Sequence, residues 1–168
     1  YLTASNRQSF GDSVPEIESG ELNADGKRVV VIGGGDTAMD CVRTAIRQGA
    51  VSVKCLYRRD RANMPGSQRE TQNAEEEGVE FVWLSAPKGF VGEGAVTGVM
   101  VQRMRLGPPD ATGRQMPELI EGADYVEDVD IGLRGDQRGY LFRRQRGRVP
   151  VVLDQLAKRL GVGIDILE

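Results

Sequence analysis

Two short segments of this chain have residue types and spacing that suit a phosphate-bearing ligand. The first is a glycine-rich run that directly follows apolar residues and reads Gly33, Gly34, Gly35, Asp36, Thr37, Ala38. It fits the pattern G-x-G-x-x-A, in which the first glycine permits a tight turn and the second, Gly35, lets the backbone approach a pyrophosphate. Ala38 replaces the third glycine, where a helix packs closely on a strand. Unpaired amides and the helix dipole then favour the anion.

The surrounding sequence is needed to interpret this motif, because a glycine pattern alone is weak evidence for a nucleotide site. Here the glycines follow an apolar strand, open a helix and lie within a βαβ unit of about 30 residues, the size expected for one. This context favours a dinucleotide site over a plain tight turn. Asp36 has two interpretations, as the N-terminal cap of the helix or as a hydrogen-bond partner of the cofactor.

The second segment is the pair Arg58 and Arg59, which directly follows the next apolar strand. NAD sites carry an acid about 20 residues after the glycines, where it accepts a hydrogen bond from the ribose 2′-hydroxyl. Counting on from Ala38 reaches Arg58 instead. A guanidinium cannot accept a hydrogen bond but pairs well with a 2′-phosphate, which an acid would repel. The pair therefore favours NADPH over NADH, against the alternative of a solvated loop with charges spaced by chance.

These residues need a scaffold that alternates strand and helix, and the hydrophobic pattern indicates one. The expected elements are a strand at 27–32, a helix at 37–48, a strand at 51–57, a helix at 68–77 and a strand at 79–84. Strands at 96–106 and 116–120 then follow without helices, which indicates an inserted antiparallel β-meander at about 85–126. We predict an α/β fold, a Rossmann-like parallel sheet with helices and that insertion.

The two ends of the chain differ from the central region, 27–130, which we predict to be the NADPH-binding domain. Residues 1–26 are polar and rich in Gly, Ser, Asn and Asp, so we expect a linker with at most a short turn of helix. The tail, 131–168, opens with a Gly- and Arg-rich stretch of little periodicity. A helix at 151–160 and a short strand at 162–167 are expected to follow it.

Composition is that of an ordinary soluble protein, with 168 residues of which 39% are hydrophobic and 28% charged. A net charge of −3 gives no reason to expect nucleic acid or an anionic membrane as the partner, and no apolar run is long enough to cross a bilayer. The 2 cysteines fit a reduced cytoplasmic setting and are too few for an iron–sulfur cluster, which needs about four. The chain begins at Tyr1 rather than Met, so we expect a piece of a longer protein.

No constellation of side chains for catalysis or metal binding emerges from the sequence. There is no histidine, which removes the commonest general base and a favoured zinc ligand. The acidic run Glu75–Glu77 ends a helix and is interpreted as a solvated face rather than a catalytic pair of carboxylates. Arg143–Arg148 is similar to a nucleic-acid patch but has few aromatic residues near it, so we expect no nucleic acid. Cys41 and Cys55 fall on apolar faces and are interpreted as core thiols.

Several stretches of the chain resemble the small (β) subunits of bacterial NADPH-dependent glutamate synthases. They are Tyr1–Arg7, Gly26–Cys41, Cys55–Ser67, Asn73–Trp83 and Ala111–Val126. The resemblance implies a two-dinucleotide flavoprotein in which an FAD domain surrounds an inserted NADPH domain, with this chain as the insert and 1–26 as the crossover from the FAD domain. It also implies that NADPH gives a hydride to FAD, and that electrons pass through [4Fe-4S] clusters to the large subunit, which makes glutamate from glutamine and 2-oxoglutarate.

The resemblance also assigns NADPH contacts to the glycine turn, Asp36, Thr37, Arg58 and Arg59. The sequence also departs from the family in two ways. The FAD glycine motif and the cluster cysteines are absent, and after Asp130 the segment 131–136 replaces a buried strand of the family. We therefore hypothesise that the divergent tail, 131–168, is a frameshifted or truncated reading.

Two other interpretations stay open. One is the NADPH domain of another iron–sulfur flavoprotein, such as a pyrimidine-reducing enzyme, which shares the glycine turn and a basic pair. The loop Asn63–Ser67 favours the glutamate synthase type over this alternative. The other is a non-catalytic NADP(H)-binding module, which would sense the NADPH/NADP ratio or hold a partner with its basic tail.

Overall fold

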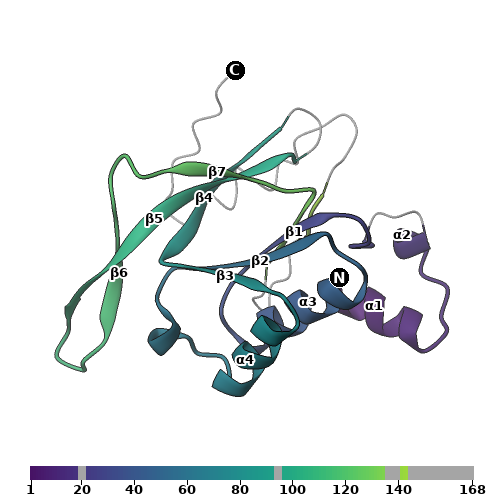
Figure 1. Ribbon diagram of the computed structural model, residues 1–168, viewed down its shortest axis with the longest axis horizontal. Coiled ribbons are helices and arrows are strands. Elements are labelled where there is room, and N and C mark those ends of the chain that lie inside the picture. The colour runs from purple at the N-terminus through teal and green to yellow at the C-terminus, as the bar shows by residue number, and fades with distance from the viewer. Residues whose placement is uncertain (19–21, 93–95, 135–140, 144–168) are drawn as a thin grey trace.

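The computed structural model describes residues 1–18, 22–92, 96–134 and 141–143. Within them, helices, a mainly parallel sheet and an antiparallel sheet form three successive layers (Figure 1). The helices are α1 (Leu2–Ser9), α2 (Pro15–Glu18), α3 (Asp36–Arg47), the single-turn η1 (Arg61–Asn63) and α4 (Gln68–Glu76). The strands of the parallel-type sheet are β1 (Arg28–Ile32), β2 (Ser52–Tyr57), β3 (Glu80–Trp83), β8 (Ile131–Arg134) and β9 (Leu141–Arg143). The antiparallel strands are β4 (Ser85–Val91), β5 (Gly98–Pro109), β6 (Gln115–Leu119) and β7 (Tyr125–Asp128).

The parallel-type sheet has the strand order β3-β2-β1-β8-β9. Strand β1 pairs in parallel with both β2 and β8, and β9 adds an antiparallel edge. The carboxyl ends of β1 and β2 therefore lie side by side at one edge of the sheet, where both candidate segments begin. The α/β prediction is confirmed, as are the central strands and helices within a residue or two at each end.

After Arg28, strand β1 is an unbroken apolar run because the sheet is covered on both faces. Val29 and Val31 belong to the core under the helices, whereas Val30 belongs to the core between the two sheets. All of them are fully buried, and each such valine contributes roughly 1.5–3 kcal/mol of hydrophobic stabilisation. A run without polar alternation is the pattern expected for a strand buried on both faces.

The predicted antiparallel insertion is confirmed, with more strands than the sequence pattern indicated. Strand β5 is central, because β4 lies along one edge while β6 and β7 pair with different parts of its other edge. The sequence analysis placed two strands here, at 96–106 and 116–120, and assigned none at β4 or β7.

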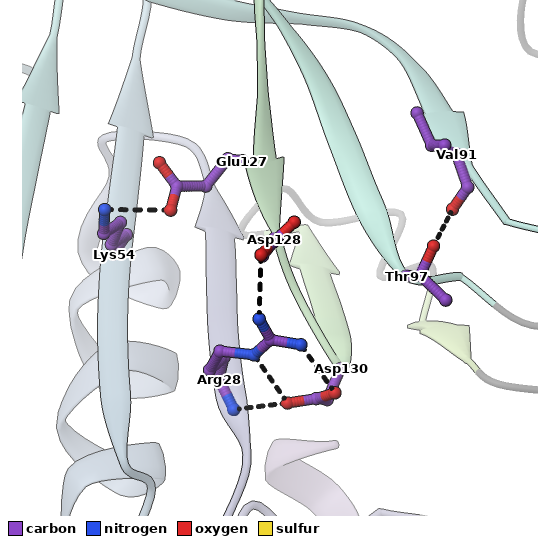
Figure 2. Close-up of polar contacts among 7 residues, drawn as sticks. All are labelled: Arg28, Lys54, Val91, Thr97, Glu127, Asp128 and Asp130. Carbon is purple, nitrogen blue, oxygen red and sulfur yellow. Dashed lines mark hydrogen bonds and ion pairs between the residues drawn. The ribbon is translucent and has the colours of Figure 1, made fainter.

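Ion pairs connect the residues of β7 and the following turn to the parallel strands (Figure 2). The Lys54 ammonium lies 2.8 Å from a Glu127 carboxylate oxygen, and the Arg28 guanidinium lies 3.1 Å from both Asp128 and Asp130. Figure 2 also shows the Thr97 hydroxyl donating to the Val91 carbonyl, which closes the connection between β4 and β5. The two sheets are thus held together by charge at one end as well as by the shared apolar core.

Both ends of the chain depart from the sequence predictions. The expected linker contains helix α1 of 8 residues, which is anchored by a hydrogen bond from the Tyr1 hydroxyl to the Gln48 side chain. The start of the tail contains β8, which pairs with β1, although its sequence showed no clear strand pattern. The helix expected at 151–160 and the strand expected at 162–167 lie outside the described residues.

Candidate functional site

The glycine turn begins with a residue whose backbone only glycine adopts readily. Gly33 has φ +138° and follows β1 directly. Its amide donates to the carbonyl oxygen of Leu56 on β2 at 3.1 Å, which fixes the start of the turn against the neighbouring strand. An L-residue side chain at this φ would be strained, so the first glycine of the motif is required by backbone conformation.

The next two glycines have different surroundings. A Cβ on Gly34 would lie 2.6 Å from the ring of Tyr57, so this position lacks space for any side chain. A Cβ on Gly35 would meet nothing within 4 Å and would point into open space. Gly34 therefore serves packing, whereas Gly35 leaves its side of the turn clear for a ligand to approach the backbone.

Helix α3 starts at this turn with its amides available. Gly35 is the N-cap residue and its carbonyl accepts from the amides of Ala38 and Met39 at 2.9 and 3.2 Å, while no side chain caps the helix. The first amides of a helix have no intrahelical acceptor, and together with the helix dipole they attract an anion. Among the described residues, no acceptor is found for the amides of Gly34, Gly35 or Asp36.

The cap role predicted for Asp36 is wrong, whereas its predicted hydrogen bond to the cofactor stays a prediction. It occupies the first turn of α3 rather than the cap position, and its Oδ1 accepts from the amide of Ser67 at 3.3 Å. The neighbouring Gly66 donates its amide to the carbonyl oxygen of Gly34 at 2.9 Å. Asp36 thus ties the loop before α4 to the glycine turn, while Thr37 beside it is exposed.

Gly66 and Ser67 are site residues that the sequence analysis missed. A Cβ on Gly66 would lie 2.9 Å from the Gly34 carbonyl oxygen, so the loop approaches the turn more closely than a side chain permits. The sequence shows only that this residue is glycine. In the structure, its φ is outside the left-handed region, so the close approach to Gly34 rather than the backbone conformation requires glycine here.

The loop between β2 and α4 is held in place by its own polar contacts. Asp60 accepts from the amide and the side chain of Asn63 at 3.0 and 2.7 Å, which caps η1. The Tyr57 hydroxyl donates to the Asn63 carbonyl at 3.0 Å, and the buried Met64 accepts weakly from Thr71. The same loop carries Arg58 and Arg59, so these contacts define the backbone from which both arginines project.

The arginine pair lies at the carboxyl end of β2, next to the glycine turn at the carboxyl end of β1. Arg58 is exposed and has no ion pair with any described residue. Arg59 is only 8% exposed, and its Nε is buried without an acceptor. A buried polar group without a partner is costly, and a charged one more so, which indicates that this arginine is held ready for an anion.

The acidic run and the two cysteines have structural roles, whereas the side chains of Arg143–Arg148 lie outside the part of the chain that the structure describes. Each glutamate of Glu75–Glu77 contacts a side chain of the chain itself: Glu75 pairs with Arg61, Glu76 with Gln72, and Glu77 with Arg43 and Arg47. Cys41 and Cys55 are both buried, which confirms them as core thiols. This burial raises the pKa of the Cys41 thiol to about 11 and that of the Cys55 thiol to about 12. Within the described part of the chain, no group of side chains suits a metal ion, and no helix is long and apolar enough to span a membrane.

Chemically, this edge of the sheet presents groups that suit an elongated anion. Unpaired amides at the turn suit a pyrophosphate, and two guanidinium groups one strand away suit a further phosphate. The open space at Gly35 and the unpartnered Nε of Arg59 are the observations that fit a phosphorylated dinucleotide.

Comparison with known proteins gives one family and a consistent set of relatives. The family described as pyridine nucleotide-disulphide oxidoreductase matches residues 4–107. The chain is 78% identical over 133 residues to a putative glutamate synthase [NADPH] small chain of Cereibacter sphaeroides, which covers 79% of this chain and 32% of the relative. It is 65% identical over 134 residues to the glutamate synthase [NADPH] small chain of Azospirillum brasilense, covering 80% and 28% respectively. The chain thus spans about a third of the length of the curated relatives it matches.

Among solved structures, Mycobacterium tuberculosis FprA in complex with NADPH matches with a TM-score of 0.58 and 16% sequence identity, over 72% of this chain and 41% of that one. Thioredoxin reductase of T. acidophilum matches with a TM-score of 0.50 and 20% sequence identity, over 75% of this chain and 42% of that one. At such low identity these likenesses concern the fold alone, and they agree with the Rossmann-like prediction.

Proposed function

Because this chain belongs to the pyridine nucleotide-disulphide oxidoreductase family, we propose that it is the NADPH-binding part of an oxidoreductase of the glutamate synthase small-chain type. In this role it holds NADPH so that a hydride passes to FAD, and the electrons serve glutamate synthesis. The identity of 78% to a putative NADPH-dependent small chain supports this choice over the 46% identity to the β subunit of the NADPH-Fe(3+) oxidoreductase of Geobacter sulfurreducens.

The observation that carries the proposal is the meeting of two anion-attracting features at one sheet edge. The amides of Gly34–Asp36 follow β1 and have no acceptor among the described residues. Arg58 and Arg59 follow the adjacent β2, and neither has an acidic partner in that part of the chain. An NAD site has an acid at the second position, where these arginines would instead attract a 2′-phosphate. The arrangement therefore suits NADPH better than NADH.

Each part of the site has a separate task in this proposal. The amides after Gly33 receive the pyrophosphate, and Gly35 leaves room for it. Arg58 and Arg59 receive the 2′-phosphate. Nicotinamide and flavin supply the redox chemistry when bound, so the side chains of this chain bind and orient without acting as acid or base.

The proposal extends to the rest of the protein through the relatives. They are small chains of glutamate synthase, so we propose the large subunit as the partner and the cytoplasm as the location. FAD and [4Fe-4S] clusters would be held by other parts of the protein. The 168-residue chain is then expected to bind NADPH but to reduce no dye until a flavoprotein is added.

The test is a titration of the chain with NADPH and with NADH, repeated for Arg58→Ala. Charge-assisted hydrogen bonds contribute roughly 1.5–3 kcal/mol, so NADPH affinity should fall on the order of tenfold or more. NADH affinity should barely change. Arg61→Ala is a matched control from the same loop, because Arg61 is already paired with Glu75 at 2.8 Å. Equal weakening for both nucleotides in Arg58→Ala would remove the 2′-phosphate assignment.

A further inference from the structure

The two neighbouring arginines differ in burial, and this difference draws attention to the residues that contact Arg59. Arg58 is exposed, whereas Arg59 is 8% exposed. An exposed guanidinium changes rotamer freely and can reach a ligand from several directions. A buried one is directed by whatever packs around it, so the surroundings of Arg59 decide where its charge points.

Arg59 is buried without any acidic partner among the described residues. Its Nε has no acceptor, and the contact found for its Nη2 is the thioether sulfur of Met116 at 3.9 Å. A thioether is a weak acceptor and carries no charge. Met116 therefore contacts the guanidinium without neutralising its charge.

The contact between Met116 and Arg59 links the antiparallel sheet to the loop after β2. Met116 lies on β6 of the antiparallel insertion, and Arg59 lies in the loop after β2. The backbone of Arg59 is linked to the same insertion, because its carbonyl accepts from the Leu84 amide at 3.0 Å, and the Leu84 carbonyl accepts from the Met104 amide at 2.8 Å. Leu84 has φ +52°, a left-handed conformation that is unfavourable for leucine and persists only where the surrounding structure enforces it.

We propose that Met116 is a positioning residue for nucleotide selectivity. By packing on the Arg59 guanidinium, it holds that group toward the position of the 2′-phosphate, so that the antiparallel insertion contributes to the choice of NADPH over NADH. This inference rests on the proposed function. Met116 acts through Arg59 and need not touch the nucleotide.

The experiment measures the dissociation constants of NADPH and NADH for the 168-residue chain and three variants, with folding checked by circular dichroism. In Met116→Ala the Arg59 side chain must be ordered on binding, which should weaken NADPH by about threefold to tenfold and leave NADH within about twofold. Met116→Leu conserves volume and should retain the selectivity of the unmodified chain. Leu119→Ala is the matched control, because Leu119 lies on the same strand and is 54% exposed, against 52% for Met116.

The outcomes separate this inference from the function on which it rests. A chain that binds NADPH and NADH equally well overturns the proposed function and this inference together. A chain that prefers NADPH, with the preference unchanged in Met116→Ala or equally reduced in Leu119→Ala, overturns the role of Met116 alone. Loss of preference in Met116→Ala, with retention in Met116→Leu and Leu119→Ala, supports it.

Discussion

Gly66 donates its amide to the carbonyl oxygen of Gly34 at 2.9 Å, and this hydrogen bond joins the loop before α4 to the glycine turn. The contact is so close that a Cβ on Gly66 would itself lie 2.9 Å from the same oxygen. The glycine turn is thus supported by this loop as well as by β1 and α3. The loop that carries Arg58 and Arg59 is the segment that provides this support.

Substituting Gly66 by alanine should therefore displace the glycine turn. We expect NADPH and NADH to bind more weakly by a similar factor, because both share the pyrophosphate that this turn receives. Gly89→Ala is a suitable control, since a Cβ at Gly89 would meet nothing within 4 Å. Dissociation constants that match those of the unmodified chain, with the fold intact, would show that the loop does not support the turn.

Gly34→Ala should lower the stability of the fold, whereas Gly35→Ala should lower the affinity for nucleotides. The new methyl group at Gly34 meets the Tyr57 ring at 2.6 Å, and such overpacking typically costs about 1–3 kcal/mol of unfolding free energy. The methyl group at Gly35 meets no protein atom, so stability should be almost unchanged while both nucleotides lose affinity. Thermal unfolding and nucleotide titration of the two variants check this. Tight binding by Gly35→Ala would mean that the pyrophosphate does not pass over Gly35.

Glu77 should contribute stability that depends on pH. Burial alone would raise its pKa, but the hydrogen bonds and charges of Arg43 and Arg47 outweigh that effect and leave the pKa of Glu77 below its usual range. A carboxylate with a lowered pKa stabilises the folded state above its unfolded pKa of about 4.3, and this contribution is lost as pH falls through the folded value. Glu77→Gln should therefore be less stable by about 1 kcal/mol at pH 7 and close to the unmodified chain at pH 2.

Urea unfolding at both pH values measures this difference. Glu76→Gln serves as the control, because Glu76 is exposed and accepts from Gln72 of the same helix. If the unfolding free energies of Glu77→Gln and the unmodified chain differ by the same amount at both pH values, the ion pair is not the cause of the difference.

The βαβ unit could be predicted because its signals are local. The signals are an apolar strand, a glycine turn and an amphipathic helix followed by Gly49, and all lie in consecutive residues. Strand β4 gave no such signal, because Pro87 and Gly89 interrupt it, and its pairing with β5 shifts register between those two residues. Helix α1 is polar, and its formation depends on contacts with α3 such as the hydrogen bond from Tyr1 to Gln48.

The candidate site could be predicted where its residues are close in the sequence, but not where it depends on contacts between distant residues. The glycines and both arginines follow from spacing within a single βαβ unit. The contact of Met116 with Arg59 joins residues 57 positions apart, and no local pattern indicates it. The contact of Asp36 with Ser67, 31 residues away, is equally invisible in the sequence.

A crystal structure of the chain with NADPH would test the central claim most directly. The account predicts the pyrophosphate over Gly35 at the start of α3, and the 2′-phosphate within hydrogen-bond distance of the Arg58 and Arg59 guanidinium groups. The account would be contradicted by a complex in which both guanidinium groups point into solvent while the adenosine lies elsewhere on the molecule.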